Sequence, residues 1–184
     1  TIISSKDERD FLSNFNKDPI VHKSAFIATN SNVIGNVEIG EHSSVWFNCL
    51  LRGDGNYIRV GKRTNIQDGS IVHIDSKKFP THIGDDVTIG HGCIIHAATI
   101  RSLTLIGMGA IVLDGSEISS NVIVGAGSLV PPGVLLESGF LYMGSPCKKV
   151  RALNENDYKM IIETSKDYVD HSKVYKKKYG LRSS

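Results

Sequence analysis

The stretch IGDDVTIGHGCII, residues 83–95, carries the pattern that decides the fold. Ile83, Ile89 and Ile95 lie six residues apart, and Val87 and Cys93 each stand four positions after an isoleucine. Neither a helix nor a simple alternating strand has a period of six, whereas a coil of three short strands with one inward apolar residue per strand does. The sequence therefore predicts an all-β solenoid, a parallel β-helix of hexapeptide repeats. The inward positions of the whole chain are Ile27, Val33, Ile39, Val45, Leu51, Val60, Ile66, Val72, Ile83, Ile89, Ile95, Ile100, Ile106, Val112, Ile118, Val124 and Val130.

Three breaks interrupt this spacing, and each predicts a local change in the coils. The stretch 53–56 adds three residues, which predicts a turn that protrudes from its coil. The stretch 75–82 adds five and predicts a surface loop, whereas 95–100 loses one residue. We expect regular ladder bonding to stop at Pro131-Pro132-Gly133, because proline cannot donate a hydrogen bond to a ladder.

The period becomes helical between about Glu155 and Tyr179, with Asn154 as the expected N-cap and Gly180 as the expected stop. An amphipathic helix needs an apolar surface, and a face of the prism is the nearest one. The predicted organisation is an N-terminal lead-in over 1–20, the hexapeptide-repeat β-helix over 21–150, and a C-terminal amphipathic helix and tail over 151–184.

Composition narrows the class of protein further. A net charge of +2 without a clustered basic patch does not favour nucleic-acid binding, and no segment is apolar enough to span a membrane. The N-terminus lacks the profile of a signal peptide, so we expect a cytoplasmic protein. Cys49 and Cys93 face inward two coils apart, about 9–10 Å, which is too far for a disulfide, so we expect free thiols.

Counting hexads, three per coil, places polar side chains in columns. The residues that directly follow three inward positions on one face are Arg52, His73 and His96, on successive coils about 4.8 Å apart. Two imidazoles at that separation can converge on one metal ion with Zn–N distances of about 2.0–2.1 Å. The column therefore predicts half of a metal site.

A second face carries Asp68 and His91 one coil apart, with Gln67 beside Asp68. Two faces of one prism cannot easily reach the same point, but an adjacent subunit can bring this face against the column that holds His73 and His96. Such a contact is heterologous, and three-fold closure suits a three-sided prism. The register therefore predicts a cyclic trimer with three sites between subunits.

Short motifs accompany these histidines along nearly the whole chain: Arg52-Gly53-Asp54, Asn65-Ile66-Gln67-Asp68, His73, Ile89-Gly90-His91, His96, Gly107-Met108-Gly109-Ala110, Tyr142 and the closing turn Gly144-Ser145-Pro146-Cys147-Lys148-Lys149-Val150-Arg151. Together they resemble the gamma-class carbonic anhydrases of the hexapeptide-repeat superfamily. The hexads alone are shared with acyltransferases, whereas three histidines at these spacings, with Arg-x-Asp and Asn-x-Gln-Asp, are far more specific.

The resemblance implies a left-handed β-helix that assembles as a homotrimer. It also implies a divalent metal ion held by His73 and His96 of one chain and His91 of the next. Zinc is the expected ion, with iron or cobalt as alternatives. The implied reaction is the reversible hydration of carbon dioxide to bicarbonate, because the ion lowers the pKa of bound water from 15.7 towards about 7. No partner beyond this substrate pair and the chain itself is implied.

The resemblance also implies roles around the ion. Gln67 would orient the attacking hydroxide with Asn65 nearby, Arg52 would pair across the interface with Asp68, and Asp54 would support that network. The alternative for Arg52, Asp54 and Asp68 is a salt-bridge set that only stabilises the trimer. Tyr142 stands where the family keeps a tyrosine near the site; the alternative for this residue is a packed aromatic.

The chain departs from the most active members of that family. Glutamates that carry protons away from their metal are replaced here by Gly55 and by the stretch 75–78, and an asparagine two residues after the tyrosine is Gly144. The residues therefore predict metal binding more directly than fast turnover. Two other functions stay open: a hexapeptide-family acyl-CoA thioesterase or acyltransferase, and a non-catalytic assembly subunit that retains the metal site.

Overall fold

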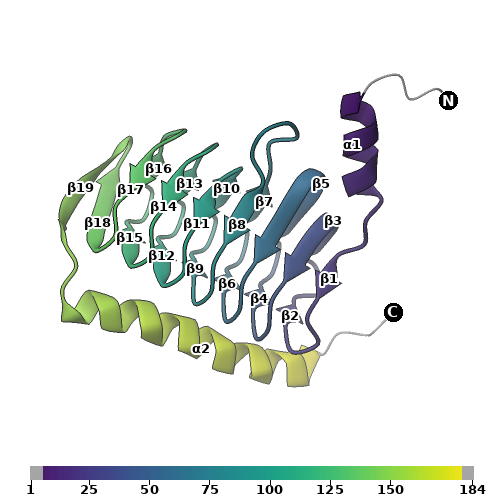
Figure 1. Ribbon diagram of the computed structural model, residues 1–184. Helices are drawn as coiled ribbons and strands as arrows, with labels where there is room; N and C mark the ends of the chain where they lie inside the picture. Colours follow the sequence, from purple (N-terminus) through teal and green to yellow (C-terminus); the bar gives the residue numbers. More distant parts are fainter. Residues whose placement is uncertain (1–5, 180–184) are drawn as a thin grey trace.

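The computed structural model describes residues 6–179 and is a left-handed parallel β-helix of about seven coils (Figure 1). A short helix, α1 (Lys6–Phe15), precedes the coils and a long helix, α2 (Glu155–Tyr179), follows them and runs along their length. Neither of these helices is long and apolar enough to cross a membrane. The fold class predicted from the hexads is therefore confirmed.

Three faces make up the prism, and each coil visits them in the same order. Face 1 holds the first half of β3 (Asn32–Ile39) and of β5 (Leu50–Val60), then β7 (Ile71–His73), β10 (Ile94–His96), β13 (Ile111–Val112) and β16 (Leu129–Val130). Face 2 holds β1 (Ile20–Val21), the second half of β3 and of β5, β8 (Thr81–Ile83), β11 (Thr99–Ile100), β14 (Glu117–Ile118) and β17 (Leu135–Leu136).

Face 3 is the eight-stranded sheet, and it ends in an antiparallel pair that closes the last coil. Its strands are β2 (Phe26–Ile27), β4 (Ser44–Val45), β6 (Asn65–Ile66), β9 (Thr88–Ile89), β12 (Thr104–Ile106), β15 (Val122–Val124), β18 (Phe140–Gly144) and β19 (Cys147–Ala152).

The inward residues predicted from the six-residue spacing form the core. All of them are buried except Ile27 and Val33, which are partly buried against the same cluster at the first coil. Cys49 and Cys93 are buried free thiols, as expected. Burial raises the pKa of the Cys49 thiol to about 11, so this group stays protonated and acts as a small core side chain.

Two expectations about the coils are wrong. The three residues added at 53–56 do not form a turn: β5 continues through them as one strand, and its register against β3 shifts between Gly35 and Val37. The ladder also continues past Pro131-Pro132-Gly133, because Leu135 pairs with Glu117 and Gly133 N donates to Asp114 O at 2.9 Å. Proline is tolerated there because it lies in the turn between strands. The expected surface loop is present between β7 and β8.

Helix α2 has the predicted bounds and the predicted cap. Asp157 N donates to Asn154 Oδ1 at 3.1 Å, and Asn154 N donates to Asp157 Oδ2 at 2.8 Å, a reciprocal capping box. Gly180, the expected stop, lies outside the described residues. The helix packs on face 3 through aromatic side chains: the Trp46 ring lies 5.3 Å from that of Tyr168 and 4.9 Å from that of Tyr175.

The expected N-terminal lead-in contains a helix, α1, which the six-residue pattern does not predict. Its Phe11 and Phe15 rings, one turn apart, stack with centroids 6.0 Å apart. The helix lies against β3 and β5, where Asn36 Nδ2 donates to Asn14 Oδ1 at 2.7 Å. This contact places α1 beside the inserted residues of β5.

Candidate metal centre

His73 and His96 are the last residues of adjacent strands β7 and β10, at the corner between face 1 and face 2. The register pairs them directly, and Nδ1 of His73 lies 3.3 Å from Nε2 of His96. The column predicted from the hexads is therefore present in the structure. Two nitrogens bound tetrahedrally to one ion at 2.0–2.1 Å lie about 3.3 Å apart, so this separation fits a shared metal ion.

Carboxylates hold the other nitrogen of both rings. Asp54 Oδ1 lies 3.2 Å from Nε2 of His73, and Asp114 Oδ1 lies 2.6 Å from Nδ1 of His96. Histidines that bind metals usually have such a partner, which fixes the ring and raises its basicity. This donor set fits a divalent metal ion.

Asp54 also accepts a hydrogen bond from Arg52, so the two residues form an ion pair within one chain. Burial raises the pKa of Asp54, but the hydrogen bonds from Arg52 and His73 outweigh it and leave that pKa below its ordinary value. Burial lowers the pKa of His73, which favours the neutral imidazole that metals require.

His91 lies at a different corner, between face 3 and face 1. Its Nδ1 is 3.0 Å from Asp68 Oδ2, and the backbone stacks the two residues on adjacent coils, since Gly92 N donates to Asp68 O at 2.9 Å. Both side chains are nearly half exposed, His91 at 46% and Asp68 at 40%. Each of the three predicted metal ligands thus has one ring nitrogen within hydrogen-bond distance of a carboxylate.

Gln67 and Asn65 lie next to His91 on face 3, where both are buried. Gln67 Nε2 donates to Asn65 Oδ1 at 3.0 Å, and Asn65 Nδ2 donates to Thr88 Oγ1 at 2.9 Å. This chain of hydrogen bonds fixes the Gln67 amide. The structure therefore brings Gln67, Asn65, Asp68 and His91 together on one side of the prism.

The structure keeps this second group apart from the first within one chain. Among residues 6–179, no cluster of three or more His, Cys, Asp or Glu side chains could hold a metal ion. The pairing of Arg52 with Asp68 is likewise not made within the chain, because Arg52 pairs with Asp54 and Asp68 with His91. Each chain thus presents two candidate half-sites, one at each edge of face 1.

Tyr142 is not part of either half-site. It belongs to the hydrophobic core at β18, with 5% of its surface exposed, and its hydroxyl accepts a hydrogen bond from Glu137 N at 2.9 Å. Of the two interpretations of this residue, the structure favours the packed aromatic.

Asp114 belongs to the candidate site through its contact with His96, but the hexad count does not predict it. It lies one coil beyond His96 and two positions after the inward residue Val112. The column that contains His73 and His96 was counted only from residues directly after an inward position, so it does not include Asp114. An acidic residue one coil beyond the second histidine was the available signal.

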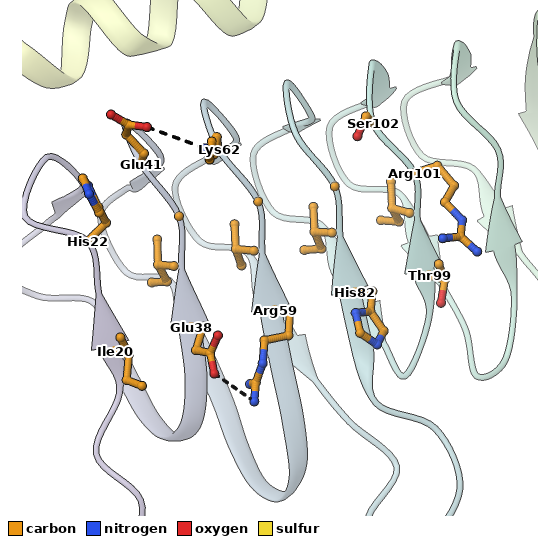
Figure 2. Close-up of a pocket in the computed structure, with 17 residues that line it drawn as sticks. Ile20, His22, Glu38, Glu41, Arg59, Lys62, His82, Thr99, Arg101 and Ser102 are labelled. Carbon is orange, nitrogen blue, oxygen red and sulfur yellow. Dashed lines mark ion pairs between the residues drawn. The ribbon is translucent and has the colours of Figure 1, made fainter.

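A groove of about 850 Å³ crosses face 2 and contains none of these three histidines. Figure 2 shows its alternating charges, with Glu38 pairing with Arg59 at 3.1 Å and Glu41 with Lys62 at 3.8 Å. Burial and the nearby Arg59 and Arg101 lower the pKa of His82 in this groove. Its third basic residue, Arg101, pairs with Glu117 outside the groove at 2.8 Å, so each of its Arg, Lys and Glu side chains already has an ion-pair partner.

Comparison with known proteins agrees with these motifs. No family model matches the chain. It is 44% identical to the carbonic anhydrase of Geobacillus kaustophilus, over 91% of this chain and 92% of that protein. It is 41% identical to the mitochondrial gamma carbonic anhydrase 2 of Arabidopsis thaliana, over 91% of this chain but only 62% of the length of that relative.

Among solved structures, a hexapeptide transferase family protein of Anaplasma phagocytophilum superposes with a TM-score of 0.82 at 40% identity, covering 85% of this chain and 92% of that one. Fold, motifs and relatives therefore agree, and the chain belongs to the gamma carbonic anhydrase family.

Proposed function

We propose that this protein catalyses the reversible hydration of carbon dioxide to bicarbonate at a metal site shared between subunits. His73 and His96 of one chain and His91 of its neighbour are the proposed ligands. The observation that carries the proposal is that each of these imidazoles has one nitrogen held by a carboxylate, while two of them present nitrogens 3.3 Å apart. Three neutral ligands leave a tetrahedral ion one open position.

A homotrimer would complete the site. The two half-sites flank face 1, whose outward column is an apolar stripe, and two of its members, Ile71 and Ile94, are 41% and 38% exposed. A three-fold axis parallel to the prism keeps equivalent coils level, so His91 of one chain meets His96 of the next. The stripe is Leu50, Ile71, Ile94, Ile111 and Leu129.

A divalent ion in this site supplies a positive charge that makes water acidic enough to act as a nucleophile near neutral pH. Zinc is the proposed ion. Gln67, fixed by Asn65, would orient the nucleophile and the substrate through its amide. Asp54, Asp68 and Asp114 hold the rings of the three ligands in place. Arg52, paired with Asp54 in its own chain, would reach Asp68 of the neighbour and lock the two half-sites together.

The test is carbon dioxide hydration by stopped flow, on protein loaded with zinc and, anaerobically, with ferrous iron. We expect metal-dependent activity that is lost in His91→Ala. His22→Ala is the matched control, because His22 is an exposed residue whose ring lies 2.8 Å from Ser24 Oγ and which borders the groove on face 2, where none of the three proposed ligands lies. Activity in the control and none in His91→Ala supports the proposal.

A filled metal site without hydration activity would contradict it. In that case thioester hydrolysis or an assembly role would explain the fold and the histidines better than carbon dioxide hydration does. The Anaplasma neighbour, a hexapeptide transferase family protein, makes acyl chemistry the first alternative to assay. A cytoplasmic location stays a prediction from the sequence.

A further inference from the structure

A hollow of about 310 Å³ lies between α2 and the corner of the prism that carries Asp68. Asp68 also contacts His91, whose Nδ1 lies 3.0 Å from Asp68 Oδ2. The hollow therefore adjoins the half-site that contains His91. Its walls come from both elements, with Trp46, Phe47 and Asp68 from the prism and Tyr168, His171 and Tyr175 from the helix.

Hydration of carbon dioxide releases a proton that the site must lose before the next turnover. One carbon dioxide and one water give one bicarbonate and one proton. We propose that the imidazole of His171 takes up this proton through the hollow and passes it to buffer in the solvent, which returns the ring to its neutral form. This inference rests on the proposed function, because it names the proton acceptor of that reaction.

One side of α2 lies along this half-site. The helix runs the length of the prism (Figure 1), and its residues on that side are Thr164, Tyr168, His171 and Tyr175, spaced by four, three and four positions. Thr164 borders a second hollow, which is lined by His91. The regular spacing of a packed helix therefore holds His171 at the hollow that Asp68 lines.

His171 has the chemistry that a proton acceptor needs. Imidazole is the side chain whose protonation ordinarily changes near neutral pH, so it can both take up and release a proton there. His171 is exposed, so buffer in the solvent reaches it. Burial, and then the charge of Asp68, raises the pKa of Tyr168, so that this hydroxyl keeps its proton. The Tyr168 ring, 5.8 Å from that of His171, is thus a wall of the hollow and not a carrier.

The hollow is large enough for water to connect Asp68 with His171. A water molecule takes up about 30 Å³ in the liquid, so a volume of about 310 Å³ holds several. The Asp68 side chain is 40% exposed and offers carboxylate oxygens to that water. The nearest charged group on α2 itself is Asp170, which pairs with Lys173 at 2.8 Å. Asp68 is therefore the charged group that the prism contributes to the hollow.

The first experiment measures hydration by stopped flow on zinc-loaded protein at low buffer concentration. In His171→Ala, kcat should fall at least about tenfold, because the proton leaves after bicarbonate and its transfer then limits turnover. The ratio kcat/KM should not change, since it includes only the steps up to the departure of bicarbonate. His22→Ala removes an exposed histidine at the face 2 groove and is the matched control, which should keep both values.

Chemical rescue separates proton transfer from a structural role. Free imidazole should restore kcat of His171→Ala in a saturable way and have little effect on the wild type. His171→Gln keeps a polar side chain that does not titrate, so it should behave like His171→Ala, and it replaces that variant if alanine prevents folding. An equal fall of kcat and kcat/KM in a folded variant, without rescue, would show that His171 is structural and overturn the proposal.

A crystal structure of the assembled protein at pH 7 tests the route without turnover. We expect ordered water that connects the Asp68 carboxylate with the His171 ring; a hollow that the neighbouring subunit closes, or that holds no such water, would overturn the route. Unchanged kcat in His171→Ala of an active protein would overturn the role of His171 and leave the proposed function intact. A wild type that never hydrates carbon dioxide would instead defeat the proposed function itself.

Discussion

Asp114→Asn tests how the chain prepares His96 to bind a metal ion. The carboxylate oxygen lies 2.6 Å from His96 Nδ1, so it fixes which nitrogen faces His73 and polarises the ring. Asparagine keeps the size and the accepting oxygen but removes the charge, and a charge-assisted hydrogen bond is about twice as strong as a neutral one. The change therefore isolates the electrostatic part of the contact.

The expected loss is about 10- to 100-fold in metal affinity, the usual effect of removing such a partner. At about 1.4 kcal/mol for each factor of ten, this amounts to about 1.4–2.8 kcal/mol. The effect should be confined to metal binding, because His96 and Asp114 are about one-third exposed and lie outside the core.

The assay is competition for zinc between the assembled protein and a chromophoric chelator at pH 7. Asp170→Asn is the control, since Asp170 is an exposed residue of α2 that pairs with Lys173. The thermal midpoint of the metal-free protein should be the same for both variants and the wild type. A zinc affinity of Asp114→Asn within about twofold of the control would show that the carboxylate does not tune His96.

Three further predictions concern assembly and stability. Ile94→Glu places a charge in the apolar stripe of face 1 and should yield monomers in analytical ultracentrifugation; intact trimers would contradict the proposed interface. Trp46→Ala empties the contact under α2 and should cost about 3–5 kcal/mol in urea unfolding, against less than about 1 kcal/mol for the exposed Ile162→Ala. Hydrogen bonds from Arg151 and, to a smaller extent, from Asn154 N lower the pKa of Asp157 to about 2. The contribution of this carboxylate to the stability of the fold is therefore full above about pH 4 and is lost as the pH falls towards 2. Between pH 5 and 2 the thermal midpoint should fall less in Asp157→Asn than in the wild type. An equal fall in both proteins would count against the stabilising role of the Asp157–Arg151 pair.

The core and the register of the histidines could be predicted because the hexad is a strict period. One inward apolar residue per strand fixes which positions superpose, so counting residues was enough to place His73 above His96. The helix over 155–179 was equally predictable, since its cap and its spacing are local signals.

The path of β5 could not be predicted from the same count. Three added residues break the six-residue period, and a glycine-rich insertion is locally typical of a turn. In the structure these residues stay extended because β3 pairs with both ends of the strand and α1 lies against its middle. Pairing with neighbouring coils thus outweighed the local preference.

The missed role of Asp114 and the misplaced Tyr142 have a common cause. Hexad counting assigns a residue to a corner or a face but not the direction in which a long side chain points. Asp114 reaches back one coil to His96, and Tyr142 turns inward so that its hydroxyl meets the Glu137 amide. Both outcomes depend on side-chain packing that a one-dimensional pattern does not contain.

Complementation between two inactive variants is the sharpest test of a metal site shared between subunits. His91→Ala and His73→Ala each destroy every site in their own trimers. Random mixing of the two chains makes about a quarter of the interfaces complete, since half of the chains on each side carry the intact half-site. We expect the randomly mixed population as a whole to regain about a quarter of the wild-type zinc content and hydration rate. Mixed trimers that bind no zinc and stay inactive would rule out a site shared in this way.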